Sequence, residues 1–180
     1  MPVIVSNPTW VATTWDDPRA AELREAMTSD LAPRYADLWE RRDRLLASAE
    51  PGALSRVPTS DEVLVTWIAL DGPQAVATGS LRRLGGTARH PEVIHDRHPE
   101  VIHEVKRMFV RPSHRRRGLA AGVLAAVERS ARDRGIEVLH LQTGIRQPEA
   151  VALYEREGWT RTDPYPPYPA ETSICFEKRL

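Results

Sequence analysis

The sequence Glu104-Val-Lys-Arg-Met-Phe-Val110, followed shortly by Arg115-Arg-Arg-Gly-Leu-Ala120, decides the fold of this chain. An apolar strand runs here into a glycine turn that opens an alanine-rich helix. A helix that begins near Gly118 presents unpaired backbone N–H groups and the positive end of its dipole, so it can bind a phosphate through the main chain. Glycine suits this position because a ligand can approach a backbone that has no Cβ, and because a tight turn can need a positive φ. On spacing alone, the other interpretation is a solvated arginine loop.

The composition indicates one domain without a strong overall charge. The chain has 180 residues, with 25 Lys+Arg and 25 Asp+Glu. A neutral chain has no long-range attraction to nucleic acid or to an anionic membrane, so the arginine run is a local feature. We expect no nucleic-acid partner. A nucleic-acid binder acting through residues 111–117 is an alternative, and it predicts salt-dependent DNA affinity.

The single cysteine, Cys175, excludes an internal disulfide and a cysteine metal cluster, which suits a reducing cytoplasm. Its neighbours are typical of a strand interior, so we expect a buried, unreactive thiol rather than a nucleophile. The start of the chain has no charged leader before an apolar run, and no segment reaches ~18 apolar residues. These features predict a soluble cytoplasmic protein with no membrane partner.

Hydrophobic spacing predicts helices in the first third of the chain and a strand-rich remainder. Residues 9–14 favour a strand, Asp16-Asp17-Pro18 favours a helix start, and Pro33 predicts a break between two amphipathic helices. Further strands are predicted at 62–70, 74–84, 101–110, 136–143, 159–162 and 173–178, with helices at 118–134 and 148–157. A meander followed by strand, helix and strand predicts an α+β fold with a βαβ crossover.

A tandem duplication precedes the third of these strands. His90-Pro-Glu-Val-Ile-His95 recurs as His98-Pro-Glu-Val-Ile-His103. Four histidines could form a metal site. A duplication copies its histidines without selecting them, however, and its prolines disfavour a rigid cage. We predict a lengthened, mobile hairpin loop and no metal, and the role of the segment stays open.

Two motifs resemble those of the GNAT superfamily of acyl-CoA-dependent N-acetyltransferases. Residues 104–120 contain Arg-x-x-Gly-x-Ala, which is similar to the pyrophosphate loop of that family. Residues 141–144, Leu-Gln-Thr-Gly, and 147–159, Gln-Pro-Glu-Ala-Val-Ala-Leu-Tyr-Glu-Arg-Glu-Gly-Trp, resemble its second conserved block. The resemblance covers about residues 60–180. It implies a mixed, mostly antiparallel sheet of about six or seven strands, with a splayed parallel pair and flanking helices. In that single domain, 1–180, residues 1–60 would shape the acceptor site and residues 61–180 would form the acetyl-CoA-binding core.

The resemblance also implies the contacts to the cofactor. Pantetheine carries peptide-like amides and can pair with a strand edge as an added strand. The implied contacts are Met108, Phe109 and Val110 for pantetheine, and Arg115, Arg116, Arg117, Gly118, Leu119, Ala120 and Ala121 for the pyrophosphate, with Gln147 nearby. Many family members have asparagine where this chain has Gln147, so its contact with the cofactor stays open. For His114 we expect a solvent-facing loop position.

Two catalytic side chains follow from the same resemblance. Tyr154 matches the tyrosine that protonates the departing thiolate in many members, and the alternative is a tyrosine that only packs in a helix seam. Glu104 lies where members with a glutamate general base carry it. An amine of pKa near ~10.4 must lose a proton before it attacks a thioester, and a carboxylate can accept that proton. The alternative for Glu104 is a cross-strand ion pair with an arginine such as Arg82 or Arg83.

The expected reaction is acetyl transfer from acetyl-CoA to a primary amine by direct attack in a ternary complex. The alternative is a catalytically silent CoA-binding regulatory or interaction module. Aromatic and acidic residues of the first third would suit a cationic amine; they are Trp10, Trp15, Tyr35, Trp39, Asp16, Asp37 and Glu40. Tyr165 and Tyr168 are interpreted as a lip over the acceptor pocket, or else as a plain surface loop. The acceptor itself, whether a small molecule, a peptide terminus or a lysine side chain, stays open, and so does a homodimer through the last strands.

Overall fold

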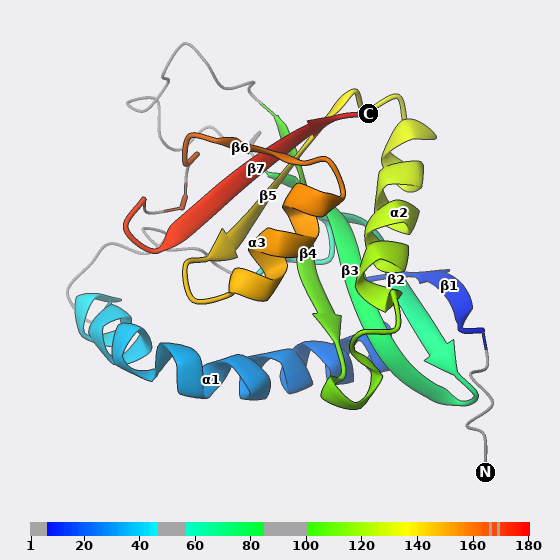
Figure 1. Cartoon of the computed structure of the whole chain (residues 1–180), viewed down its shortest axis with the longest axis horizontal. Coiled ribbons are helices and arrows are strands. Elements are labelled where there is room, and N and C mark those ends of the chain that lie inside the picture. The colour runs from blue at the N-terminus through cyan, green and yellow to red at the C-terminus, as the bar shows by residue number, and fades with distance from the viewer. Residues whose placement is uncertain (1–6, 47–56, 85–100, 166, 169) are drawn as a thin grey trace.

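The sheet runs through the whole molecule and has helices on both faces (Figure 1). A computed structural model describes residues 7–46, 57–84, 101–165, 167–168 and 170–180, with the backbone alone described for 39–46. The strands are β1 (Thr9–Thr13), β2 (Val63–Asp71), β3 (Gln74–Leu84), β4 (Ile102–Val110), β5 (Val138–Gly144), β6 (Thr160–Thr162) and β7 (Ser173–Arg179). The helices are α1 (Pro18–Leu46), α2 (Leu119–Arg132) and α3 (Pro148–Arg156), and a 3₁₀ turn, η1 (Pro112–His114), precedes α2.

The strand order is β1-β2-β3-β4-β5-β7-β6, and every pairing is antiparallel except that of β4 with β5. The predicted fold class is therefore confirmed: a mixed, mostly antiparallel sheet of seven strands with flanking helices. Two residue pairs join the parallel strands, Glu104 with His140 and Val105 with Leu141. Beyond these pairs β4 and β5 separate (Figure 1). The separation leaves one edge of β4 without a neighbouring strand.

A bulge interrupts β4 just after its last contact with β5. The pairing of β3 with β4 shifts between Thr78 and Ser80, so more than one residue of β4 lies opposite Gly79. Arg107 takes a positive φ of 56° there. Gly79 is required at this point, since an added Cβ would lie 2.5 Å from Val123 and 2.7 Å from the sulfur of Met108. Bulges of this kind redirect side chains and end regular pairing.

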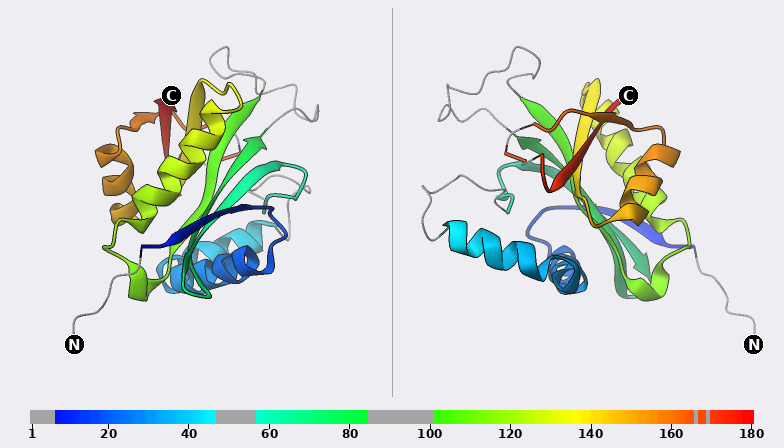
Figure 2. Two further views of the ribbon diagram at one scale, coloured as in Figure 1. Left: turned by 90° about the vertical axis from the view of Figure 1, so that its right-hand side faces the viewer. Right: turned by 60° about the vertical axis from the view of Figure 1, so that its left-hand side comes forward.

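The two faces of the sheet are covered by different helices (Figure 2). Helices α2 and α3 pack on one face, where Val105 and Leu141 meet Val123 in the main core. Helix α1 packs on the other face, with Leu23 against Phe109. Because successive strand residues point to opposite faces, Glu104 and Lys106 lie on the α1 side of the sheet. We call this side the α1 face.

The predicted break at Pro33 is wrong, because α1 continues through this residue to Leu46. Proline inside a helix removes one hydrogen bond and kinks the helix, and α1 changes direction along its length (Figure 2). Contacts beyond the proline hold the second half in place: the Tyr35 hydroxyl accepts a hydrogen bond from the Arg146 amide at 3.1 Å, and Asp37 pairs with the Arg146 guanidinium. Tertiary packing therefore outweighs the local preference.

The remaining predicted elements are confirmed to within two residues at each end. Asp17 caps α1 as expected, since its Oδ1 accepts the Arg19 amide at 2.8 Å. Cys175 is buried in β7. Most of the duplicated segment, residues 90–100, lies outside the described residues, and His103 belongs to β4. None of the helices in the described part of the chain combines the length and apolar character that a bilayer crossing requires.

Candidate active site

The start of α2 forms a cradle of unpaired amides. Gly118 precedes the helix with a φ of 76°, and Arg116 has a φ of 61°. Within the described chain, the amides of residues 116–121 have no hydrogen-bond partner, and the first paired amide of α2 is that of Gly122, which donates to the Gly118 carbonyl at 3.0 Å. The Arg115 amide, by contrast, lies 3.4 Å from the Pro112 carbonyl. Successive N–H groups in such a turn converge on one point and bind anions. The cradle consists of the amides of 116–121 and does not include that of Arg115.

Most of the arginine side chains around the cradle already contact carboxylates of the protein. Arg115 pairs with Asp30 of α1 at 2.7 Å and also donates to the Val110 carbonyl at 3.1 Å. Arg117 lies 3.4 Å from the carboxylate of Asp71. Arg116 has no side-chain partner among the residues that the structure describes. Binding of an anion here therefore depends mainly on the main chain.

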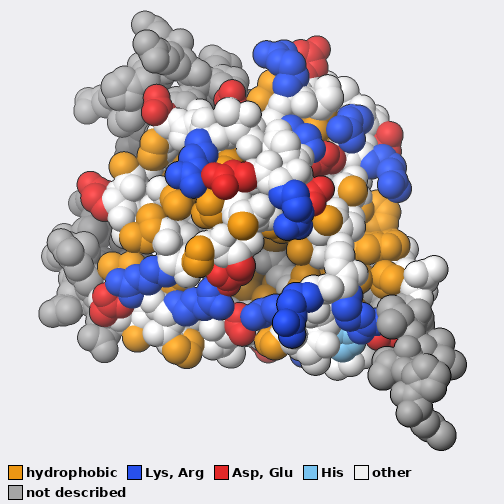
Figure 3. Space-filling model, viewed as in Figure 1, with side chains coloured by type: hydrophobic (Ala, Val, Ile, Leu, Met, Phe, Trp, Pro, Cys, Tyr) orange, Lys and Arg blue, Asp and Glu red, His pale blue; other side chains and the backbone are white. Residues whose placement is uncertain are grey.

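A cavity of about 380 Å³ leads from the cradle into the molecule, between α1, β4 and α3. Figure 3 shows this hollow, with Lys and Arg side chains around its rim. All predicted cofactor contacts except Arg117 line it, namely Met108, Phe109, Val110, Arg115, Arg116, Gly118, Leu119, Ala120, Ala121 and Gln147. His114 also lines it and is half-buried, with Nε2 3.3 Å from Asp71, rather than facing solvent. Sequence reasoning missed the α1 residues Met27, Asp30 and Leu31, because their place beside β4 depends on how α1 packs.

Tyr154 of α3 lies at the cavity wall. Its ring is buried against Phe176 and Trp159, with centroids 5.6 Å and 6.3 Å away. The structure gives its hydroxyl no hydrogen-bond partner among the described residues. Burial raises the pKa of Tyr154 well above its ordinary value. The phenol therefore keeps its proton at neutral pH and can donate it to a group in the cavity.

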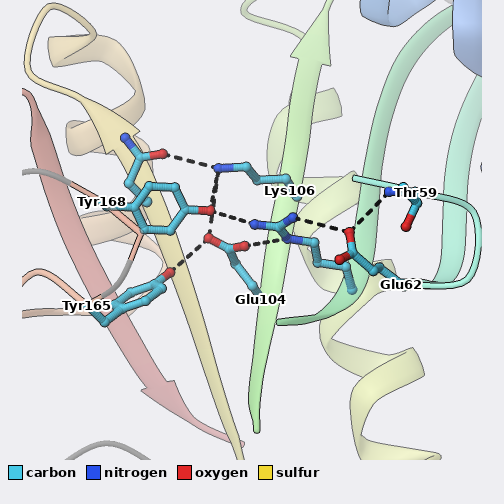
Figure 4. A network of polar contacts seen from close by, with 8 residues as sticks. Thr59, Glu62, Glu104, Lys106, Tyr165 and Tyr168 are labelled. Carbon is cyan, nitrogen blue, oxygen red and sulfur yellow. Dashed lines mark hydrogen bonds and ion pairs between the residues drawn. The ribbon is translucent and has the colours of Figure 1, made fainter. Parts of the chain in front are cut away.

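Glu104 lies in a buried polar network on the α1 face (Figure 4). Its carboxylate is 0% exposed, accepts the Arg82 Nε–H at 2.6 Å, and accepts the Tyr165 hydroxyl at 2.9 Å. Burial alone would raise the pKa of Glu104, but the charges of Lys106 and Arg82 outweigh burial and hold it below its ordinary value. The cross-strand ion pair with Arg82, which was the alternative interpretation of Glu104, is therefore present. Glu104 does not line the cavity.

Lys106 and Tyr168 complete this network. The Tyr168 hydroxyl accepts hydrogen bonds from Arg82 Nη2 at 2.7 Å and from Lys106 Nζ at 2.8 Å. Lys106 Nζ also donates to Gln142 Oε1 of β5 at 3.2 Å, just beyond the last paired residues of β4 and β5. Burial lowers the pKa of Lys106 to about 8. Lys106 is thus a cation that can lose its proton close to neutral pH.

The family of the chain follows from its sequence as a whole. The model of the acetyltransferase (GNAT) family matches residues 20–159. The chain belongs to the GNAT family. The match includes the cradle, the parallel strands and α3.

Curated GNAT relatives match parts of the chain. An IAA acetyltransferase from Azospirillum brasilense is 40% identical over 78 residues, which are 43% of this chain and 51% of that protein. The uncharacterized N-acetyltransferase YsnE from Bacillus subtilis is 31% identical over 117 residues, which are 63% of this chain and 68% of that protein. The chain thus matches only about half the length of the Azospirillum relative.

Solved structures of GNAT proteins share the fold over nearly the whole chain. A candidate acyl-CoA N-acyltransferase from Klebsiella pneumoniae has a TM-score of 0.64 and 27% identity, with 96% of this chain and 97% of that chain covered. A GNAT acetyltransferase from Elizabethkingia anophelis, solved with acetyl-CoA bound, has a TM-score of 0.58 and 15% identity, with 97% of this chain and 99% of that chain covered. The similarity to the Elizabethkingia protein shows only that the two chains share a fold.

The described residues among those expected to form a cationic-amine site do not form a single cluster. Trp10 packs over Gly122 of α2, on the face opposite α1. Asp37 pairs with Arg146, and Asp16 accepts a hydrogen bond from Ser60. The side chains of Trp39 and Glu40 lie outside the described residues.

Tyr165 and Tyr168 are neither a lip over a pocket nor a surface loop. Their exposed fractions are 0% and 6%, and their rings meet edge to face at 5.2 Å. Both hydroxyls are hydrogen-bonded within the Glu104 network. The two tyrosines therefore cover Glu104 and hold it away from solvent.

Proposed function

We propose that this GNAT protein transfers an acetyl group from acetyl-CoA to a primary amine, by direct attack within a ternary complex. The main support is the cradle of six unpaired amides, 116–121, at the mouth of a cavity that reaches Tyr154. A helix start of this kind fits a pyrophosphate, and the family model covers the residues that form it. Acetyl-CoA would supply the thioester whose acetyl group is transferred.

The free edge of β4 suits the pantetheine arm. Because the Arg111 amide donates to the Val76 carbonyl of β3, the backbone groups of the preceding residue, Val110, point away from β3. The separation of β5 leaves this side of β4 open beyond Val105. A ligand with peptide-like amides can pair with such an edge. Met108 and Val110 are the residues that we expect to make these bonds.

Tyr154 is the proposed proton donor to the leaving thiolate. Burial keeps its phenol protonated, and its hydroxyl has no competing partner in the described chain. A thiol has an ordinary pKa near ~8.5, so donation from the phenol depends on the geometry of the bound thiolate. Positioned proton donors of this kind contribute ~10²-fold to ~10⁴-fold in rate.

For removal of the acceptor's proton, we assign Glu104 a positioning role behind Lys106. Protonation of Glu104 would break its buried ion pair with Arg82, and its carboxylate has no exposed surface. Lys106, with a pKa of about 8, is partly neutral near pH 8. Like Glu104 it is buried and does not line the cavity, but its Nζ bonds Gln142 where β4 and β5 separate. Its neutral amine can accept a proton there. Glu104 and Tyr168 would hold Lys106 in place.

Two measurements on the purified protein test the proposed function. CoA should raise the melting temperature, and acetyl-CoA with a panel of amines should release free thiol. CoA-induced stabilisation without thiol release from any amine of a panel that includes amino acids, peptides and polyamines would favour the silent CoA-binding module. Isolation of an acetylated enzyme that passes its acetyl group to the amine would contradict direct attack.

A further inference from the structure

We propose that the acceptor amine also carries a carboxylate, and that Arg24 of α1 and Arg107 of β4 bind it. This inference rests on the proposed function and narrows it to amino-acid-like acceptors. The two arginines lie on the α1 face, outside the residues that line the cofactor cavity.

Each of the two arginines has a buried nitrogen with no partner. Arg24 Nη1 and Arg107 Nε are inaccessible to solvent and make no hydrogen bond within the described chain. Buried polar groups in folded proteins are nearly always hydrogen-bonded, and an exception at a charged group calls for a ligand or another explanation. Several other arginines near α1 and the cavity have acidic partners, whereas the Arg116 side chain is exposed to solvent; the pairs are Arg34 with Glu149, Arg111 with Glu22, Arg115 with Asp30, and Arg146 with Asp37. Arg24 and Arg107 therefore differ from their neighbours.

The Arg24 side chain and the Arg107 backbone are held in position before any ligand binds. The Arg24 guanidinium stacks on Trp15, 3.7 Å from the ring centroid, which fixes its plane. Arg107 sits in the β4 bulge with a φ of 56°. A non-glycine residue in the left-handed region is strained, and such strain persists where the surrounding structure imposes it, often at binding sites. Held in this way, the arginines lose little freedom when an anion binds.

None of the carboxylates in the described part of the chain forms a direct ion pair with Arg24 or Arg107. Burial, and then the positive charges of Arg82 and Arg24, lower the pKa of Arg107, which indicates that these guanidinium groups share one region. The carboxylate of Glu104 is already bound to Arg82 and Tyr165. Asp16, Asp17 and Glu25 act on the Arg24 charge without hydrogen-bonding to it, and Asp17 bonds Arg19 and Thr13 instead. An anionic ligand would supply such an ion pair.

Arg107 is placed so that one small acceptor could reach both the arginines and the thioester. It lies between Lys106, which bridges to β5 at the point of separation, and Met108, which lines the cofactor cavity. A carboxylate on Arg107 would therefore lie beside the place proposed for the reacting amine. An α- or β-amino acid carries an amine and a carboxylate only two or three carbon atoms apart, and guanidinium groups bind carboxylates through paired hydrogen bonds.

The test compares amino acids with their amides, which keep the amine and lose the anion. We expect kcat/KM to be at least 10-fold higher for the acids in the wild type. Arg24→Gln should reduce kcat/KM for the acids by about 10-fold to 100-fold through KM and leave the amides unchanged, as expected for loss of a charged hydrogen bond. Arg107→Gln should lower kcat/KM for the acids by a similar factor and leave kcat/KM for the amides unchanged. Arg132→Gln, a charge-matched change on exposed α2 surface, should have no effect.

Equal turnover of acids and amides by the wild type would overturn the inference, as would an equal loss for both substrates in Arg24→Gln. Calorimetric titration with N-acetyl amino acids in the presence of CoA separates this inference from the proposed function. Binding that Arg24→Gln abolishes, without turnover of any amine, would support the anion site while the proposed function fails. Turnover of simple amines without any binding of N-acetyl amino acids would leave the proposed function standing and refute the anion site.

Discussion

Replacement of Lys106 by methionine should remove a pH-dependent gain in stability that the wild-type protein shows above neutral pH. Burial lowers the pKa of Lys106 from its ordinary value of 10.5 to about 8 in the folded chain. Between these two values the unfolded chain binds one more proton than the folded chain does, so stability rises with pH. Linkage between the two pKa values gives a gain of about 2 kcal/mol from about pH 7 to about pH 9.5.

Urea denaturation at a series of pH values measures this gain, as the free energy of unfolding of the wild type minus that of Lys106→Met. The subtraction cancels the contribution of groups that Lys106 does not affect, such as Tyr154, whose pKa burial raises and which weakens the fold as pH rises. Lys178→Met is the matched control, because it replaces the other lysine of the chain and should keep the gain. A difference that stays flat within ~0.5 kcal/mol, or that falls with pH, would refute the desolvation of Lys106 and with it the proposed proton acceptor.

Three further changes test the rest of the site. Gly118→Val should cost about 1 to 2 kcal/mol of stability, because a φ of 76° strains any residue with a Cβ. In calorimetry, it should also weaken CoA binding more than Arg116→Ala does. A larger effect of Arg116→Ala would mean that side chains rather than amides hold the anion. Tyr154→Phe should lower kcat by ~10²-fold and leave CoA affinity unchanged, and an unchanged kcat would make Tyr154 a packing residue. Glu104→Gln should destabilise the fold by about 3 kcal/mol at neutral pH, because it leaves the buried Arg82 charge with only the longer contact to Glu62, at 3.9 Å. Since the pKa of Glu104 is lowered, that loss should disappear as pH falls through the acid range in denaturation experiments, and a loss independent of pH would exclude the ion pair as its cause.

Much of the fold could be predicted from the sequence, because its signals are local. Strand alternation, the glycine before α2 and the aspartate cap of α1 each depend on a few neighbouring residues. Pro33 shows where a local rule fails. Its preference for a break was overcome by contacts of the following helical turn with the loop between β5 and α3.

In the candidate site, too, features that depend on neighbouring residues could be predicted from the sequence, and features that depend on distant residues could not. The cradle and the cofactor-facing part of β4 lie within one stretch of chain, so a motif could locate them. The residues that sequence reasoning placed wrongly or missed are those whose partners lie far along the chain. The sequence predicts a lip or a surface loop for Tyr165, although its ring is buried and its hydroxyl donates to Glu104, 61 residues away. Arg24 and Arg107 carry no motif.

The sequence by itself determined the family, the order of strands and helices along the chain, and the glycine turn at which α2 begins. These depend on backbone geometry over a few residues, which amino-acid type controls directly. Only the tertiary structure decided that Glu104 is an ion-paired carboxylate, that Lys106 lies where β4 and β5 separate, and that Arg24 and Arg107 each keep a buried nitrogen without a hydrogen-bond partner among the described residues. The physical reason is that charge, burial and pKa depend on which distant groups the sheet register and the packing of α1 bring within a few ångströms.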